Sequence, residues 1–310
     1  MNPGWREMLQ ETMLRKESLI APLFVVHGSA IKNPVTSMPG VYQLSADNAI
    51  QEVKELRDTG IKGVLLFGVP RSKDAHGSEA IQDSGIIQET LRAIKAAVPE
   101  MMLITDVCLC EYTSHGHCGI VENGVILNDK TTERLADMAV SHARAGADMV
   151  APSDMMDGTV AAIRKALDIT GFENLPVMAY AAKFASALYA PFREAAQSRP
   201  EFGDRKSHQL NSANSREAMR SLERCAVEGA DILMVKPALP YLDILLRARE
   251  RFALPLAAYQ VSGEYSMIRA AGQKGYIDED AVMLETLLAV KRAGADLIIT
   301  YFAKELAKQL

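Results

Sequence analysis

The chain has 310 residues, 48% hydrophobic and 24% charged, which is enough apolar material for two ordinary domains or for one barrel-sized domain. Its formal net charge of -5 argues against a nucleic-acid-binding protein, because such proteins usually carry a basic face. No stretch approaches the roughly 18 uninterrupted apolar residues of a membrane span, and the N-terminus lacks the features of a signal peptide. We therefore expect a cytoplasmic protein with neither membrane nor nucleic-acid partners.

Eight apolar runs alternate with helical patterns along the chain, and their density suits strands that are buried on both faces of a parallel sheet. The runs lie at 19–26, 58–69, 101–109, 144–154, 176–183, 227–237, 255–262 and 292–302. Helical periodicity lies near 46–59, 80–97, 131–145, 157–169, 214–228, 240–251 and 278–292. This alternation predicts an α/β fold, a (β/α)8 TIM barrel over residues 19–310, with residues 1–18 as an N-terminal arm. An open doubly wound sheet is the main alternative, but no GxGxxG motif follows the first run.

One phrase recurs at three of these runs. "RAGADMVAPSD" (144–154), "VEGADILMVKP" (227–237) and "RAGADLIITYF" (292–302) are near copies of one another. In each, a helix ends on a glycine, which tolerates the left-handed conformation of a helix C-terminus. A short turn and a buried strand then follow, so the repeat marks successive helix-to-strand connections of the barrel.

The third run leads into a cysteine cluster, "DVCLCEYTSHGHCGI" (106–120). Three of the four cysteines of the chain, Cys108, Cys110 and Cys118, fall within it. On a strand, the first two thiols would project to the same side. Three thiolates suit Zn²⁺ and leave the open position of a catalytic site, whereas a fourth ligand from His115 or His117 would make the site structural. Unliganded thiols are the third possibility.

Two further runs end on a lysine, Lys183 and Lys236. A lysine at the end of an apolar strand is costly unless its ammonium group is paired or deprotonated. Burial and a neighbouring cation both lower a lysine pKa, and a neutral amine can attack a ketone to form a Schiff base. Taken alone, each lysine also fits a salt bridge with a barrel acid such as Asp106 or Asp154. Two lysines on adjacent strands near a metal site favour the catalytic interpretation.

Other polar side chains fall at the ends of the predicted strands, where barrel enzymes place their chemistry. They are Asp106, Ser153, Asp154, Tyr259, Gln260, Ser262 and Tyr301. The long segment 189–217 after the fifth run carries Arg193, Arg199, Arg205 and Lys206. Long loops on this face are often lids, and arginine side chains bind carboxylates in a bidentate manner. A clamp for an acidic substrate and an ordinary solvated loop are both compatible with these residues.

The motifs together resemble the porphobilinogen synthase family, also called the 5-aminolevulinate dehydratase family. The matching stretches run in family order over nearly the whole chain: "DVCLCEYTSHGHCG", "APSDMMDG", "AKFASALYAPFR", "FGDRKSHQL", "LMVKPALPYLD" and "AYQVSGEYSMI". The resemblance implies a lyase (hydro-lyase) of tetrapyrrole and heme biosynthesis. It condenses two 5-aminolevulinate molecules asymmetrically to porphobilinogen with loss of two waters.

The resemblance also implies roles for individual residues. Lys236 forms a Schiff base with the first substrate, whose carboxylate Ser262 and Tyr301 hold, while Lys183 serves the second substrate. Arg193, Arg205 and Gln209 match the lid contacts to the second carboxylate. Cys108, Cys110 and Cys118 match the zinc-binding version of the family, in which zinc is catalytic. We add Asp106, placed to steer an amine, and Tyr259, a strand-end residue, as site candidates.

The chain departs from the family pattern at several positions. Ser221 stands where many bacterial relatives carry a glutamate that binds an allosteric magnesium, so we do not expect that site here. Thr159 and Ala190 replace a usual arginine and glycine. The family forms homo-octamers through the arm, which predicts a homo-oligomer. Two other functions compete: a class I aldolase, which needs one lysine and no metal, and a structural zinc protein.

Overall fold

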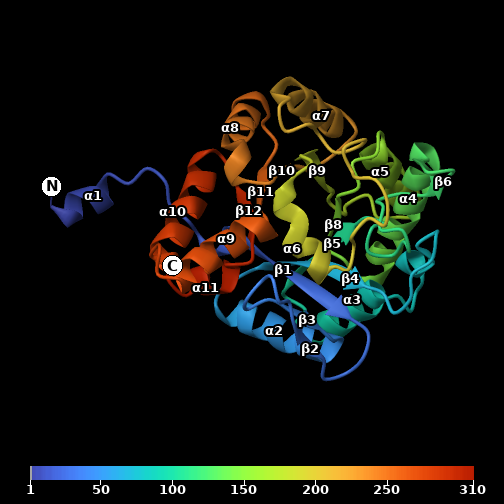
Figure 1. Ribbon diagram of the computed structural model, residues 1–310, viewed down its shortest axis with the longest axis horizontal. Helices are drawn as coiled ribbons and strands as arrows, with labels where there is room; N and C mark the ends of the chain where they lie inside the picture. The colour runs from blue at the N-terminus through green and yellow to red at the C-terminus, as the bar shows by residue number, and fades with distance from the viewer. Residues whose placement is uncertain (1) are drawn as a thin grey trace.

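The computed structural model describes residues 2–310 and contains a nearly closed barrel of eight parallel strands (Figure 1). In chain order the strands are β1 (Leu19–Val26), β4 (Gly63–Val69), β5 (Met102–Val107), β8 (Met149–Pro152), β9 (Met178–Lys183), β10 (Ile232–Lys236), β11 (Leu256–Gln260) and β12 (Leu297–Thr300). Neighbours in the barrel are neighbours in the chain, β12 pairs with β1, and a bridge between Val150 and Val177 joins β8 to β9. The predicted barrel is therefore confirmed, and the open sheet is wrong.

Helices surround the barrel on its outer face (Figure 1). The predicted helices are α2 (Ala46–Asp58), α3 (Ile86–Ala97), α4 (Asn128–Ala145), α5 (Thr159–Ile169), α7 (Ser215–Val227), α8 (Leu242–Arg251) and α10 (Glu279–Arg292). The sequence did not predict α6 (Ala190–Ala195), α9 (Ser262–Gln273) or the C-terminal α11 (Ala303–Ala307). Single turns of 3-10 helix lie at η1 (Lys16–Ser18), η2 (Ser78–Ile81), η3 (Ala187–Tyr189) and η4 (Leu239–Tyr241). Two short hairpins complete the fold, β2 (Lys32–Pro34) with β3 (Tyr42–Leu44), and β6 (Val121–Glu122) with β7 (Val125–Ile126).

The recurrent Gly-Ala-Asp phrase has a structural explanation. Each glycine adopts the positive φ that ends the preceding helix, as at Gly146 with φ of 101°. Each aspartate then accepts the backbone N–H of the neighbouring strand in the barrel. Asp148 accepts from Leu103 at 2.7 Å, and Asp296 accepts from Leu256 at 2.9 Å. The repeat thus ties the N-terminal ends of paired strands together, opposite the end that carries the chemistry.

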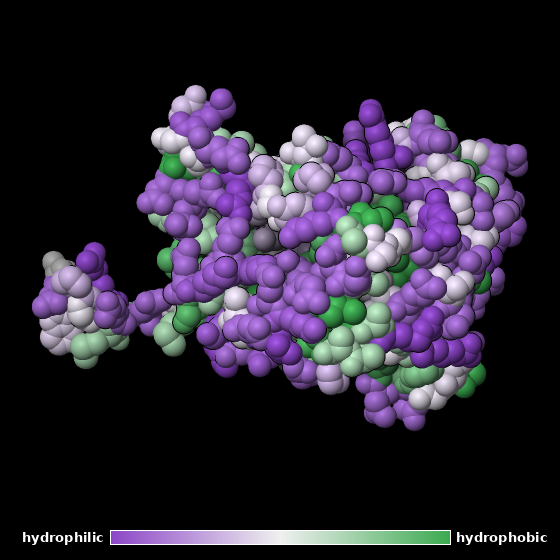
Figure 2. Space-filling model, turned by 90° about the horizontal axis from the view of Figure 1, so that it is seen from below, coloured by the Kyte–Doolittle hydropathy of each residue, from purple (hydrophilic) through white to green (hydrophobic). Residues whose placement is uncertain are grey.

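The N-terminal arm lies outside the barrel. It contains α1 (Pro3–Met8), none of whose residues is buried, and it projects from the body of the molecule in two views (Figures 1 and 2). Its apolar side chains Trp5 and Met8 are 57% and 75% exposed. Met1, the first residue of the predicted arm 1–18, lies outside the described residues. Among residues 2–310, no helix combines the length and apolar character needed to cross a membrane.

Candidate active site

Lys183 and Lys236 lie side by side at the C-terminal ends of β9 and β10. They are partners in the register of the two parallel strands, and each is only 5% exposed. Both amines lie near the ring of Tyr180, with Nζ 5.5 Å from its centroid for Lys183 and 5.0 Å for Lys236. The two lysines therefore face one interior site rather than solvent.

Aromatic rings enclose the Lys236 amine. Besides Tyr180, the rings of Tyr259, Phe192 and Tyr189 lie 4.0, 5.1 and 5.4 Å from its Nζ. Burial, reinforced by the positive charge of Lys183, lowers the pKa of Lys236 from 10.5 to about 7. A large fraction of this amine is thus neutral near pH 7, as a nucleophile for a ketone must be.

The pKa of Lys183 is shifted in the opposite direction. Its Nζ donates a hydrogen bond to the backbone carbonyl of Ser153, at the end of β8. Burial lowers the pKa of Lys183, but the three clustered thiols and Asp106 outweigh it, so the net pKa is raised. The prediction that burial lowers the pKa of both amines is therefore right for Lys236 and wrong for Lys183, because the sequence could not show how near the thiols lie.

Asp106 lies within β5, near Lys183, Lys236 and Cys110. Its Oδ2 accepts a hydrogen bond from the Ser153 hydroxyl at 3.0 Å, while its Oδ1 is buried without a protein partner. Burial and the nearby Glu111 raise the pKa of Asp106 to about 8, although the charge of Lys183 opposes this. The free oxygen and the shared Ser153 contact leave this carboxyl available to a polar group in the site.

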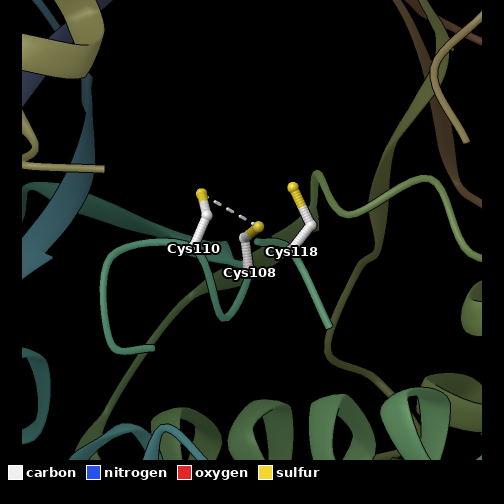
Figure 3. A group of neighbouring side chains, drawn as sticks. All are labelled: Cys108, Cys110 and Cys118. Carbon is white, nitrogen blue, oxygen red and sulfur yellow. Dashed lines mark hydrogen bonds between the residues drawn. The ribbon is translucent and has the colours of Figure 1, made fainter. Parts of the chain in front are cut away.

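Cys108, Cys110 and Cys118 converge at the site, as predicted. Their sulfurs all lie within 4.8 Å of one another and point to the same side of the chain, and those of Cys108 and Cys110 are 3.3 Å apart (Figure 3). The first two do not lie on a strand, because β5 ends at Val107, and the loop after it brings their thiols together. The thiols are buried, and three sulfur donors without an oxygen fit a soft or borderline metal ion.

Neither histidine of the motif joins the three sulfurs within the described residues. The Nε2 atom of His117 donates to the carbonyl of Phe202 at 2.9 Å, and the Nδ1 atom of His115 accepts from the backbone of His117 at 3.1 Å. The structure therefore favours a three-sulfur site over one closed by a histidine. Cys225, the fourth cysteine, lies apart on α7 and is half-buried.

The lid segment 189–217 packs over this site. Arg205, only 5% exposed, donates to the carbonyls of Gly116 at 2.8 Å and Ser198 at 2.6 Å. A Cβ on Gly116 would lie 2.4 Å from the carbonyl oxygen of Arg199, so the cysteine loop and the lid touch closely. The lid is thus fastened to the loop that carries the thiols.

Each of the three predicted lid residues has a buried polar atom without a protein partner, as do Ser198 and His208 in the same segment. Arg193 Nε, Arg205 Nε and the side-chain nitrogen of Gln209 are buried and unpaired. Burial lowers the pKa of Arg193, and Arg205 adds to this effect. Buried donors usually find an acceptor, so these three are free to bind an anionic group.

The structure brings five of the predicted site residues to the wall of one cavity. It is lined by Phe67, Asp106, Cys110, Glu111, Ser153, Lys183, Tyr189, Phe192, Arg205 and Lys236. In this conformation its volume is about 10 Å³, about enough for one water molecule. The cavity in this conformation is therefore smaller than any keto acid.

Three other predicted residues, Tyr259, Ser262 and Tyr301, come from β11, the start of α9 and the segment after β12. The hydroxyls of Tyr259 and Tyr301 are 3.1 Å apart. Ser262 is not at a strand end as predicted, because β11 ends at Gln260 and Ser262 begins α9. Its hydroxyl donates to the carbonyl of Leu188 at 3.1 Å and accepts from the backbone N–H of Phe192 at 3.0 Å.

Comparison with known proteins identifies the family of this chain. The model of the family described as delta-aminolevulinic acid dehydratase matches residues 1–309. The chain belongs to the delta-aminolevulinic acid dehydratase family. Dehydratases of this name from Synechococcus elongatus and Bacillus subtilis are 55% and 54% identical to it over 98% of this chain, and over 95% and 94% of theirs.

A solved dehydratase structure agrees with this assignment. It is the Toxoplasma gondii ME49 enzyme in complex with the reaction product porphobilinogen, which is 46% identical, with a TM-score of 0.98, over 100% of this chain and 89% of that one. The activity of the dehydratase family is that of porphobilinogen synthase, a lyase of tetrapyrrole synthesis that acts on a small-molecule substrate. The family uses a metal, and the three cysteines can bind one.

Sequence reasoning missed Tyr180, one of the rings that surround the Lys236 amine. Tyr180 and Lys183 lie three positions apart, so simple strand alternation would direct them to opposite faces. An irregularity in the β9–β10 register, between Leu233 and Val235, inserts an extra residue in β9 and lets both face the interior. Glu111 was also missed, although its position next to Cys110 in the cysteine motif was a usable signal.

Proposed function

We propose that Lys236 forms the Schiff base with the first 5-aminolevulinate molecule. The observation that carries this assignment is the buried amine among four rings, whose pKa of about 7 supplies a neutral nucleophile. Attack on the ketone and loss of one water give an iminium group, which acts as an electron sink for the following carbon–carbon bond. The same rings exclude water and disfavour the competing ammonium form.

The carboxylate of this first substrate is then held beside α9. Tyr301 and Ser262 supply the hydroxyl donors, and Tyr259 orients Tyr301 through their hydrogen bond of 3.1 Å. Burial raises the pKa of Tyr301, so its hydroxyl stays protonated and able to donate. Ser262 must exchange its present contact with Leu188 for the substrate, which links binding to movement of the lid.

The second substrate lies next to Lys183, where we place the second Schiff base. The cysteines that raise the pKa of this amine are those to which we assign a zinc ion, whose charge would offset theirs and favour the neutral amine. Arg193, Arg205 and Gln209 hold the carboxylate of the second substrate, since each offers a buried donor without a protein partner. The carboxylates of the two 5-aminolevulinate molecules are thereby bound by different parts of the site, one by the lid and one by the barrel rim. This arrangement favours an asymmetric condensation over exchange of the two substrates.

We assign Zn²⁺ to Cys108, Cys110 and Cys118. When bound, zinc supplies an open coordination position that polarises a carbonyl or holds an amine or hydroxide. Asp106 steers the amine of a substrate through its free oxygen, and Ser153 fixes the carboxyl by its hydrogen bond. We expect no allosteric magnesium, because Ser221 offers only a hydroxyl.

The experiment measures porphobilinogen formed from 5-aminolevulinate by a colorimetric assay. We expect activity with zinc, its loss on chelation, and its loss in Lys236→Met and Lys183→Met, while the exposed Lys165→Met keeps the wild-type rate. Full turnover after complete zinc removal would contradict the metal assignment. Wild-type turnover in Lys236→Met would contradict the proposed nucleophile.

We also propose a homo-octamer assembled through the N-terminal arm. The support is the family resemblance and the exposed apolar side chains Trp5 and Met8 on a helix with no buried residue. Light scattering of the full chain tests this proposal against a Trp5→Ser, Met8→Ser variant, which we expect to form smaller particles. Residence in the cytoplasm stays a prediction.

A further inference from the structure

Glu264 is a buried carboxylate for which the proposed chemistry has no role. It is the third residue of α9 and is 1% exposed. Its Oε2 accepts the backbone N–H of Val261 at 2.5 Å, and its Oε1 accepts the backbone N–H of Leu239 at 2.7 Å. Within residues 2–310, no lysine, arginine or histidine forms an ion pair with it. Burial raises the pKa of Glu264 to about 7, although its hydrogen bonds from backbone N–H groups and the charge of Lys236 oppose this. The carboxyl is therefore held in place by its two backbone hydrogen bonds.

The two backbone groups belong to different parts of the site. Leu239 begins η4, three residues after Lys236 at the end of β10. Val261 directly precedes Ser262, the proposed ligand of the first carboxylate. The Glu264 carboxylate thus joins two segments through hydrogen bonds. One follows Lys236, the proposed nucleophile, and the other precedes Ser262, the proposed ligand of the substrate carboxylate.

The first turn of α9 is also packed closely against η3 on its other side. A Cβ on Gly263 would lie 2.6 Å from the carbonyl oxygen of Leu188 in η3, so the helix presses directly against this backbone. Ser262 bonds to the same carbonyl and to the N–H of Phe192. The first turn of α9 is therefore fixed between η3 and the segment after Lys236, and Glu264 provides the second of these attachments.

We propose that Glu264 is a positioning residue, which sets the separation between the Lys236 amine and the Ser262 hydroxyl so that one keto acid reaches both. This inference rests on the proposed function, since it takes Lys236 as nucleophile and Ser262 as carboxylate ligand. A ketone without a carboxylate needs no such match, because it contacts the lysine alone. The ratio of the trapping rates of a keto acid and of a simple ketone therefore measures the role of Glu264.

The test compares borohydride trapping on Lys236 by 4-oxopentanoate and by butanone in the zinc-loaded protein, each quantified by peptide mapping. In Glu264→Gln, the amide keeps the volume of the carboxyl but turns its NH₂ group toward one of the two N–H donors. We expect the trapping rate of 4-oxopentanoate relative to that of butanone to fall roughly 10-fold. A small shift of Ser262 relative to Lys236 would prevent one keto acid from contacting both residues at once. Loss of stability alone would lower both rates and leave the ratio unchanged.

Two further variants make the result specific. Asp296→Asn is the matched control, because Asp296 also accepts a backbone N–H, from Leu256, but at the opposite end of β11. Ser262→Ala should reduce the ratio as Glu264→Gln does, and the double variant should reduce it no further. If Glu264→Gln does not fold, Val261→Pro removes one donor at a φ of -82° that proline nearly matches.

The possible outcomes separate the two proposals. Absence of label on Lys236 in the wild-type protein would contradict the proposed function. If wild type is labelled on Lys236 and the ratio is unchanged in Glu264→Gln or in Val261→Pro, the positioning role of Glu264 is overturned. The proposed role of Lys236 then still holds. A ratio that falls equally in Asp296→Asn would also overturn the positioning role, since the effect would not depend on the site.

Discussion

Replacing Lys236 by methionine should stabilise the protein, because its amine is held in surroundings that disfavour the charged form. A pKa lowered from 10.5 to about 7 means that the folded chain binds fewer protons than the unfolded chain between these pH values. Lys236 therefore destabilises the folded chain most below pH 7, and this destabilisation shrinks as the pH rises toward 10.5. Methionine keeps the apolar contacts with the four rings and removes the titrating group.

The magnitude follows from the two pKa values. The ammonium form is disfavoured by about 5 kcal/mol on folding, so we expect Lys236→Met to gain up to about 4 kcal/mol at pH 7 and about 2 kcal/mol at pH 9. The gain should nearly vanish at pH 10.5. Lys165→Met, at an exposed position on α5, should change stability little and show no such dependence.

The assay is urea unfolding followed by circular dichroism at pH 7, 8 and 9, with wild type and both variants at equal protein concentration and without zinc. Comparison at each pH cancels the titration of those buried groups that do not interact with Lys236. A Lys236→Met variant that is less stable than wild type at pH 7, or whose advantage does not shrink toward pH 9, would refute the desolvated-amine argument.

Three other perturbations follow from the same geometry. Lys183→Met removes a cation that lowers the pKa of Lys236, so the pH midpoint of borohydride trapping on Lys236 should move upward from about 7; an unchanged midpoint would contradict the coupling. Gly116→Ala places a Cβ against the carbonyl of Arg199 at a φ of +68°, so porphobilinogen formation should fall at least 10-fold through lid displacement, in a protein whose unfolding midpoint shows that it still folds. Burial lowers the pKa of His142 to about 3, so wild-type stability falls as pH drops below 6.5, and His142→Leu should gain about 2 kcal/mol relative to wild type between pH 7 and 5 in urea unfolding.

The barrel was predictable because its strands are buried on both faces. Every residue of β4, β9, β10 and β11 is buried, and such strands read as continuous apolar runs. The helix α9 was not predictable by the same reasoning. Its first turn contains Gly263, a poor helix former, which the contact with Leu188 requires. Ser262 was consequently placed at the end of a strand.

Residue type, position and the family resemblance were enough to name candidate site residues, but not to predict their electrostatics. The predicted thiols, lysines and lid arginines converge because the C-terminal ends of parallel strands meet on one face. The opposite pKa shifts of Lys183 and Lys236 depend on which charges lie near each amine, and no spacing in the sequence encodes this. The buried acceptor Glu264 is equally invisible, because its partners come from two separate loops.

The most direct measurement is borohydride reduction of the protein with 5-aminolevulinate at pH 7, followed by mass-spectrometric mapping of the modified peptides. The account predicts label on Lys236 at substoichiometric substrate, retained after chelation of the metal and absent in Lys236→Met. Substrate turned over to porphobilinogen without any label on Lys236 would contradict it.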